Sequence, residues 1–244
     1  MTPEQEIEVA AKLHYSFLPD DLNNQYLDIA TLCLPLGKIG GDYCSITHID
    51  DDTTIVGICD VTGHNIFSAL LAARINTYMV SHAKQYLGPC ELIEGLNEYL
   101  CKHISKTGTY TSFGFLSISR RDNEIIFGGA ALPPIIYFNS ITQEVETLNS
   151  ETIFLGAIHP LPVKCEMHKR NISAGDRIIM STDGVIEAEN SERELWGIES
   201  VMNILKENFK EGSRELNNKI MKSLYDYSDN KLNDDLTLMS IYFK

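Results

Sequence analysis

Apolar residues follow two different spacings along this chain of 244 residues. In five stretches they recur at intervals of three and four, which is the spacing of amphipathic helices. Between these stretches lie short apolar, β-branched runs bounded by Gly, Asn and Asp, which predict strands. The predicted helices lie near residues 3–17, 64–84, 90–105, 197–208 and 211–226.

The predicted strands come in clusters instead of alternating strictly with helices, and this favours a sandwich over a parallel α/β sheet. Two pairs of runs predict β-hairpins, at 112–119 with 123–129 and at 134–138 with 144–148. With 43% hydrophobic residues, a chain of this length can bury one sizeable core. We therefore expect one main domain at residues 21–244, preceded by a linker-like helix within residues 1–20.

The predicted N-terminal helix is amphipathic, and Pro19 follows its end. Ile7, Ala11 and His14 fall on one side of it. This side packs on its own domain or contacts a second copy of the chain as a dimer, and the sequence leaves both interpretations open.

Aspartates stand where predicted strands end or begin, next to glycines or turns. Taken alone, each is as well explained as a turn residue or, for Asp60, as a helix cap. Carboxylates that cluster without equal numbers of Lys and Arg repel one another, and a hard divalent cation bound through oxygen relieves this repulsion. An all-oxygen site indicates magnesium or manganese instead of zinc. The aspartates are Asp42 after Gly40-Gly41, Asp60 before Val61-Thr62-Gly63, Asp183 before Gly184, and Asp234 beside Asp235.

Five motifs occur in order along the chain: Gly-Gly-Asp (40–42), Asp-Val-Thr-Gly-His (60–64), Gly-Gly-Ala-Ala-Leu-Pro-Pro (128–134), Ser-Thr-Asp-Gly-Val-Ile-Glu-Ala (181–188) and Asp-Asp-Leu-Thr (234–237). This ordered set resembles the bacterial serine phosphatases of the SpoIIE/RsbU type, a branch of the metal-dependent PPM protein phosphatases. The resemblance spans about Leu13 to Phe243. It implies an α+β fold, a four-layer α-β-β-α sandwich of two antiparallel sheets flanked by helices, with a two-metal centre at one edge.

The same resemblance implies roles for individual residues. Asp60 is expected to bridge two Mn²⁺ or Mg²⁺ ions, with the Val61 backbone carbonyl completing one of them. Asp183 and Asp234 are the remaining ligands of the second ion, and Asp42 holds a metal or orients its water. Two such ions make hydroxide available near neutral pH to attack phosphorus. Gly41, Gly63, His64, Gly184 and Asp235 are expected to support the site, with Asp235 the less favoured ligand of its pair; His64 contacts phosphate or merely supports the turn.

Three positions depart from the family pattern. Cys44 stands where a second aromatic residue is usual, and Leu132 stands where a histidine is common. Asn65 replaces a usual glycine, and we expect it to be tolerated because Asn can adopt left-handed backbone geometry.

Charge and cysteine usage limit the partners and the compartment. A formal net charge of −14 disfavours nucleic acid and anionic membranes as partners. By resemblance, the expected partner is a phosphorylated protein, a STAS-type anti-sigma-factor antagonist. The six cysteines form no Cys-x-x-Cys pair, and no long apolar stretch or basic leader occurs. We therefore expect a reduced, cytoplasmic protein.

Three functions are compared. The leading one is a metal-dependent protein serine/threonine phosphatase, which acts on phosphoserine or phosphothreonine through a metal-activated hydroxide. A second is a catalytically weakened phosphatase fold that only binds and regulates a partner; the presence of all four candidate ligands disfavours it. The third is a diguanylate cyclase, suggested by Gly-Gly-Asp alone. In diguanylate cyclases the motif continues with an acidic residue and Phe, whereas in this chain Tyr43-Cys44 follow it.

Overall fold

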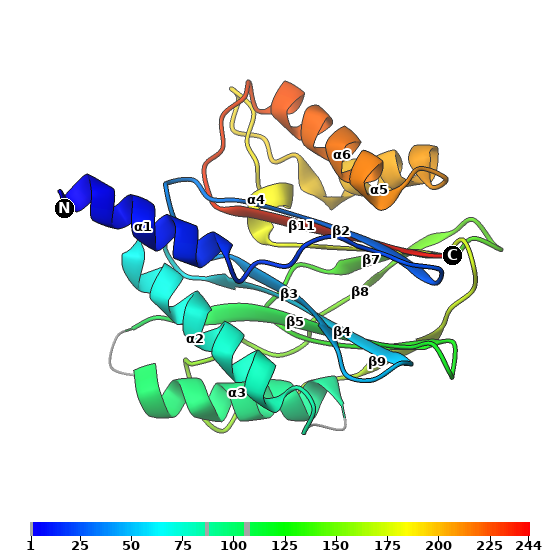
Figure 1. Cartoon of the computed structure of the whole chain (residues 1–244). Coiled ribbons are helices and arrows are strands. Elements are labelled where there is room, and N and C mark those ends of the chain that lie inside the picture. The colour runs from blue at the N-terminus through cyan, green and yellow to red at the C-terminus, as the bar shows by residue number, and fades with distance from the viewer. Residues whose placement is uncertain (1, 86–87, 105–107) are drawn as a thin grey trace.

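Two antiparallel β-sheets pack face to face, and helices cover both outer faces (Figure 1). The computed structural model describes residues 2–85, 88–104 and 108–244. This arrangement confirms the predicted α+β fold and its four layers.

The six-stranded sheet has the strand order β1-β2-β11-β10-β7-β8, and all of its neighbouring pairs are antiparallel. Its central strand, β11, comes from the C-terminal end of the chain and lies between β2 and β10. The strands are β1 (Leu22–Asn23), β2 (Leu27–Leu34), β7 (Ile135–Phe138), β8 (Val145–Leu148), β10 (Arg177–Ser181) and β11 (Leu236–Phe243).

The five-stranded sheet has the order β3-β4-β5-β6-β9, again antiparallel throughout. The two predicted hairpins are present as β5–β6 in this sheet and β7–β8 in the other. The strands are β3 (Tyr43–His48), β4 (Thr53–Val61), β5 (Thr111–Ser119), β6 (Glu124–Ala130) and β9 (His168–Asn171).

Helices α2 and α3 cover the five-stranded sheet, and α5 and α6 cover the six-stranded sheet, beside the short helix α4 (Figure 1). The predicted helix ranges agree with the structure to within a few residues. Residue 105, the predicted end of α3, lies outside the described residues. The helices are α2 (Ile66–His82), α3 (Pro89–Ile104), α4 (Asp183–Ile186), α5 (Gly197–Asn208) and α6 (Ser213–Tyr227).

Strand β4 shows how the sequence builds this sandwich. Side chains alternate between the two faces of a strand. Ile55, Cys59 and Val61 pack under α2 and α3, whereas Val56 and Ile58 pack against the other sheet. Because both faces are buried, β4 is an almost continuous apolar run, and the one acidic side chain near its end stands out.

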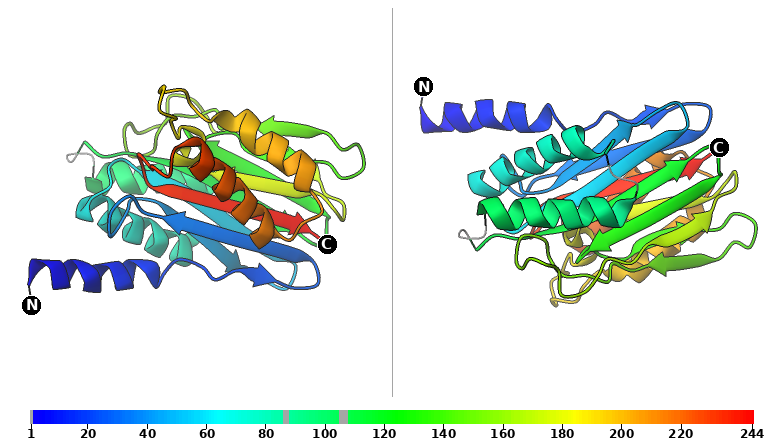
Figure 2. Two further views of the ribbon diagram at one scale, coloured as in Figure 1. Left: turned by 90° about the horizontal axis from the view of Figure 1, so that it is seen from above. Right: turned by 90° about the horizontal axis from the view of Figure 1, so that it is seen from below.

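The N-terminal helix α1 (Pro3–Tyr15) extends past the body of the sandwich (Figure 2). Thr2 caps it, and the side that carries Ile7, Ala11 and His14 is partly covered, since His14 is buried and the other two are half-buried. Leu13, on another side, is 66% exposed. The helix therefore packs on its own domain with one side only.

A disulfide joins Cys90 at the start of α3 to Cys165. The prediction that the cysteines are reduced is therefore wrong for this pair. The two residues are 75 positions apart, and they meet because α3 and the segment before β9 pack together. The other four cysteines are free. Within the described ranges, no helix has both the length and the apolar character needed to cross a membrane.

Candidate metal centre

The predicted acidic residues all lie at one end of the sandwich. Asp60 is the second-last residue of β4, and Asp42 directly precedes β3, its antiparallel neighbour. In the other sheet, Asp183 follows the end of β10 after one residue and Asp234 precedes β11. Antiparallel pairing within each sheet, together with the packing of the two sheets against each other, brings these four chain segments to a common edge.

The neighbouring carboxyl groups at this edge disfavour one another's ionisation. Burial, followed by Asp183 and Asp234, raises the pKa of Asp60 to about 7. Burial and the neighbouring Asp60 raise the pKa of Asp42 well above its usual range. The pKa of Asp183 is raised by burial and by Asp234. None of the ion pairs in the described part of the chain involves these four residues, so their negative charge has no salt-bridge partner there.

Gly41 allows the backbone before β3 to approach the end of β4. A Cβ atom at this position would lie 2.5 Å from the carbonyl oxygen of Val61 and 2.9 Å from that of Gly63. No larger residue fits without moving the backbone. The predicted supporting role of Gly41 thus has a physical basis, because this contact places Asp42 beside the Val61 carbonyl.

Gly184 makes an equally close approach in the other sheet. A Cβ atom there would collide with the backbone carbonyl oxygen of Asp235. The turn after β10 and the segment before β11 therefore lie in contact, which brings Asp183 next to Asp234.

Asp235 connects the two sheets with its side chain. Its Oδ1 accepts a hydrogen bond of 2.8 Å from the backbone N–H of Leu36, and its Oδ2 accepts one of 2.6 Å from that of Gly41. Both carboxylate oxygens are thereby engaged in holding the Gly-Gly-Asp segment. This contact gives Asp235 a supporting role and explains why it is the less suitable ligand of its pair.

Sequence analysis did not single out Thr182, which orients Asp42. The Thr182 hydroxyl donates a hydrogen bond of 2.8 Å to Oδ2 of Asp42 and accepts one of 2.9 Å from the backbone N–H of Thr237. Both threonines are fully buried. Both threonines belong to recognised motifs, Ser-Thr-Asp-Gly and Asp-Asp-Leu-Thr. The motifs mark these positions as part of the site, but only the tertiary structure shows that Thr182 and Thr237 form hydrogen bonds that orient Asp42.

The oxygen atoms at this edge suit a hard divalent cation. Oδ1 of Asp42 is buried without a hydrogen-bond partner, and the neighbouring carboxyl groups are uncompensated. Within the described residues, no three His, Cys, Asp or Glu side chains are already arranged as a metal site. Like charges repel, so we expect carboxylates to come closer together when a cation lies between them.

The turn between β4 and α2 differs from the prediction at Asn65. Its φ of −125° is extended and not left-handed; the left-handed residue is Gly63, with φ of 88°. The Asn65 side chain accepts hydrogen bonds from the N–H groups of Phe67 and Ser68 and caps α2. Asn is therefore accommodated as a helix cap, and this excludes Asp60 from that role. His64 is exposed on the same turn.

The other two departures from the family pattern are core residues. Leu132 is buried between the two sheets, and its side chain occupies the space where a Cβ atom of Gly114 would lie. Cys44 is fully buried, with its Sγ atom 3.2 Å from Sγ of Cys33 in the facing sheet.

Comparison with known proteins places this arrangement in a family. The family model of Stage II sporulation protein E (SpoIIE) matches residues 50–244. The chain belongs to the SpoIIE family. The match begins just before β4 and so includes Asp60, Asp183 and Asp234, whereas Asp42 lies outside it.

Relatives of this SpoIIE-family chain are distant in sequence. The phosphoserine phosphatase RsbP of Bacillus subtilis (strain 168) is 22% identical over 191 residues, which are 77% of this chain and 46% of RsbP. The chain thus spans about half the length of that curated relative. The SiaA-PP2C domain of Pseudomonas aeruginosa superposes with a TM-score of 0.84 at 19% identity, covering 100% of both chains. A structure of RsbX in complex with magnesium superposes with a TM-score of 0.69 at 18% identity, covering 92% of this chain and 98% of RsbX. These structural likenesses establish the PP2C fold.

Proposed function

We propose that this protein is a metal-dependent phosphatase that hydrolyses phosphoserine or phosphothreonine in a regulatory protein. The observation that carries the proposal is the meeting of Asp42, Asp60, Asp183 and Asp234 at one end of the sandwich, uncompensated by ion pairs among the described residues. Membership of the SpoIIE family supports it independently.

Mn²⁺ or Mg²⁺, two ions per site, is the proposed cofactor. Asp60, the Val61 carbonyl, Asp183 and Asp234 are the groups that would hold the ions, with Asp42 as a further ligand or as the residue that orients water. When bound, such ions neutralise phosphate oxygens and lower the pKa of water towards neutrality.

The chain's own residues supply a rigid frame for these ligands. Thr182 holds one oxygen of Asp42 and leaves the other free. Asp235 fixes the backbone on the N-terminal side of Asp42 through its bond to Gly41. The hydroxyl of Thr111 donates to the backbone carbonyl of Asp60 at 2.6 Å. A pre-organised set of oxygen ligands loses little freedom when it binds an ion or a phosphate group.

Hydrolysis of p-nitrophenyl phosphate and of a phosphoserine protein tests the proposal. We expect activity to require Mn²⁺ or Mg²⁺ and to collapse in Asp60→Asn and Asp183→Asn while the fold survives, as followed by circular dichroism. Asp226→Asn, at an exposed position on α6, is the matched control and should keep wild-type activity. Full activity in EDTA, or in either site variant, would refute the two-metal assignment. Binding of a phosphoprotein without turnover would favour the catalytically weakened regulator instead.

We further infer that the substrate is a phosphorylated STAS-type anti-sigma-factor antagonist. Family membership supports this inference. Incubating the purified protein with phosphorylated candidates of this class, and following loss of phosphate by mass spectrometry, tests it. An equal rate on unrelated phosphoproteins would contradict the preference.

We also propose a homodimer formed through α1. Val9 is 54% exposed and Leu13 is 66% exposed, so an apolar side of this helix faces away from its own domain. Sedimentation equilibrium of the whole chain and of a variant lacking residues 1–18 tests the proposal. A smaller particle after truncation is expected, beyond the mass of the removed residues; an unchanged association state would contradict it.

A further inference from the structure

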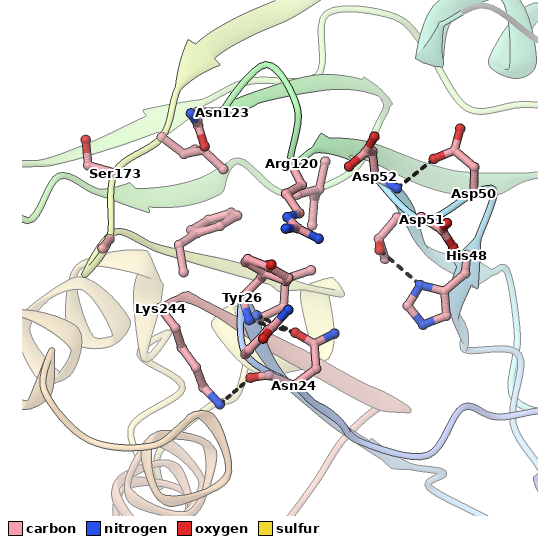
Figure 3. Close-up of a pocket in the computed structure, with 17 residues that line it drawn as sticks. Asn24, Tyr26, His48, Asp50, Asp51, Asp52, Arg120, Asn123, Ser173 and Lys244 are labelled. Atoms are coloured by element: carbon pink, nitrogen blue, oxygen red, sulfur yellow. Dashed lines mark hydrogen bonds between the residues drawn. The ribbon is translucent and has the colours of Figure 1, made fainter.

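A cavity opens at the end of the sandwich opposite the acidic cluster. It has a volume of about 610 Å³ and lies between the ends of the two sheets (Figure 3). Strand β4 begins at this cavity and ends at Asp60, and β11 ends at it after beginning beside Asp235. With a rise of about 3.3 Å per residue, the six residue steps from Thr54, which lines the cavity, to Asp60 separate the two places by roughly 20 Å. The cavity is therefore distinct from the candidate metal centre.

The cavity combines an apolar floor with a polar rim. Leu27, Ile118 and Phe243 are buried residues of the inter-sheet core, and Ile172 is half-buried beside them. The volume and the apolar floor are those of pockets that bind small organic molecules. The lining residues come from five separate segments of the chain, at 24–27, 48–54, 118–123, 172–174 and 243–244.

Arg120 gives this cavity its chemical character. Its guanidinium carbon lies 3.4 Å from the centroid of the Tyr26 ring, and Figure 3 shows the stacked pair in the middle of the cavity. Stacking uses the flat face of the guanidinium group and leaves its in-plane N–H donors free. Among the described residues, Arg120 takes part in none of the ion pairs.

The neighbouring residue Arg121 provides a contrast. It pairs with Oδ2 of Asp52 at 2.6 Å and so has a carboxylate partner within the chain. The side chain of Asp50 accepts hydrogen bonds from the backbone N–H groups of Asp52 and Thr53. Two of the three acidic side chains at the rim are thus engaged elsewhere, while Asp51 is exposed.

A second positive charge lies on the opposite side of the cavity. Nζ of Lys244 donates hydrogen bonds to Oδ1 of Asn23 and to the backbone carbonyl of Asn24, which are both uncharged acceptors. The cavity therefore has two cationic groups without a carboxylate partner in the described part of the chain, above an apolar floor.

We propose that this cavity binds a small organic carboxylate with an apolar body. The apolar part lies on Leu27, Ile118 and Phe243, and the carboxylate accepts two parallel hydrogen bonds from Arg120. A guanidinium group matches the geometry of a carboxylate in this bidentate way. Because Arg120 is already oriented by Tyr26, the complex loses less side-chain freedom than a mobile arginine would.

Isothermal titration calorimetry with decanoate and 2-naphthoate tests the proposal on the whole chain, with decan-1-ol as the uncharged comparison. We expect saturable binding of one carboxylate per chain. Arg120→Gln should weaken that binding at least about tenfold, which is the loss of one charge-assisted hydrogen bond or more. Arg193→Gln, at an exposed position that does not line the cavity, removes the same charge as the matched control and should bind as the wild type does.

A third variant tests the apolar part of the site. Ala174→Trp introduces a large side chain at the lining of the cavity and keeps Arg120. It should also lose binding while its thermal unfolding stays that of the wild type. Absence of saturable binding of either carboxylate, equal binding of decan-1-ol, or equal loss in Arg193→Gln would overturn the proposal. Phosphatase activity plays no part in these measurements, so their outcome is independent of the proposed function.

Discussion

Replacing Thr182 with valine removes one hydroxyl group that serves two buried hydrogen bonds. The hydroxyl lies 2.8 Å from Oδ2 of Asp42 and 2.9 Å from the backbone nitrogen of Thr237. Valine has nearly the same shape as threonine, so the substitution leaves almost no empty space in the core. The variant therefore isolates the loss of the hydrogen bonds.

The expected cost follows from the two groups that lose a partner. A buried N–H without an acceptor costs about 1–3 kcal/mol, and loss of a hydrogen bond to a carboxylate costs a similar amount. Thr182→Val should lower the free energy of unfolding by about 2–6 kcal/mol. Asp42 would also be free to turn, and loss of such a supporting contact typically weakens metal affinity by about 10- to 100-fold.

Urea unfolding and the Mn²⁺ dependence of phosphatase activity measure these two effects. Thr182→Ser keeps the hydroxyl group and should restore metal dependence close to that of the wild type. A destabilised Thr182→Val with an unchanged Mn²⁺ dependence would show that Thr182 is structural only. Wild-type stability in the same variant would refute the whole reasoning.

Three more predictions concern other contacts. Gly41→Ala should abolish activity and destabilise the fold, because the added methyl group would lie 2.5 Å from the Val61 carbonyl oxygen; activity and urea unfolding measure this. The metal-free protein should lose stability as pH rises from about 4 to about 7, because the folded state keeps a proton on Asp60 that the unfolded state releases, and urea unfolding in EDTA across this range measures it. Hydrogen peroxide should join Cys33 and Cys44, whose sulfur atoms are 3.2 Å apart, and peptide mapping by mass spectrometry detects the disulfide.

Each of these predictions has a control within the chain. Gly37→Ala should be tolerated, since its nearest atom would lie 3.7 Å from the new Cβ. In Asp60→Asn, the free energy of unfolding of the metal-free protein should fall less steeply with rising pH. An unchanged slope would show that groups other than Asp60 cause the pH dependence. Cys101, which is free and half-buried on α3, should not be cross-linked to Cys33 by peroxide. Failure of Cys33 and Cys44 to cross-link would contradict the contact between the two sheets.

Much of the fold was predictable because helices and strands have different local periodicities. The range of α5, residues 197–208, follows directly from the spacing of its apolar residues. The hairpins β5–β6 and β7–β8 were predictable for the same reason, since turn residues separate two short apolar runs. Helix ends were less accurate, because side-chain caps set them, as Asn65 does for α2.

The candidate site was only partly predictable. Asp42, Asp60, Asp183 and Asp234 stand out as carboxylates at the ends of apolar runs, and their meeting at one edge was expected only by resemblance to a family. The role of Thr182 and the hydrogen bonds by which Asp235 supports the site could not be predicted, because each depends on a partner in a distant part of the chain. The Cys90–Cys165 disulfide was missed for the same reason.

By itself, the sequence determined the local elements and the chemistry at their ends, because side-chain pattern and residue type act over a few neighbouring positions. Only the tertiary structure decided which ends meet. The face-to-face packing of the two sheets brings Asp60, near the end of β4, and Asp234, just before β11, to one end of the sandwich, and Arg120 and Lys244 to the other. Close contacts between segments far apart in the chain, such as Gly41 on Val61, depend on how the two sheets pack, and no single segment of sequence contains that information.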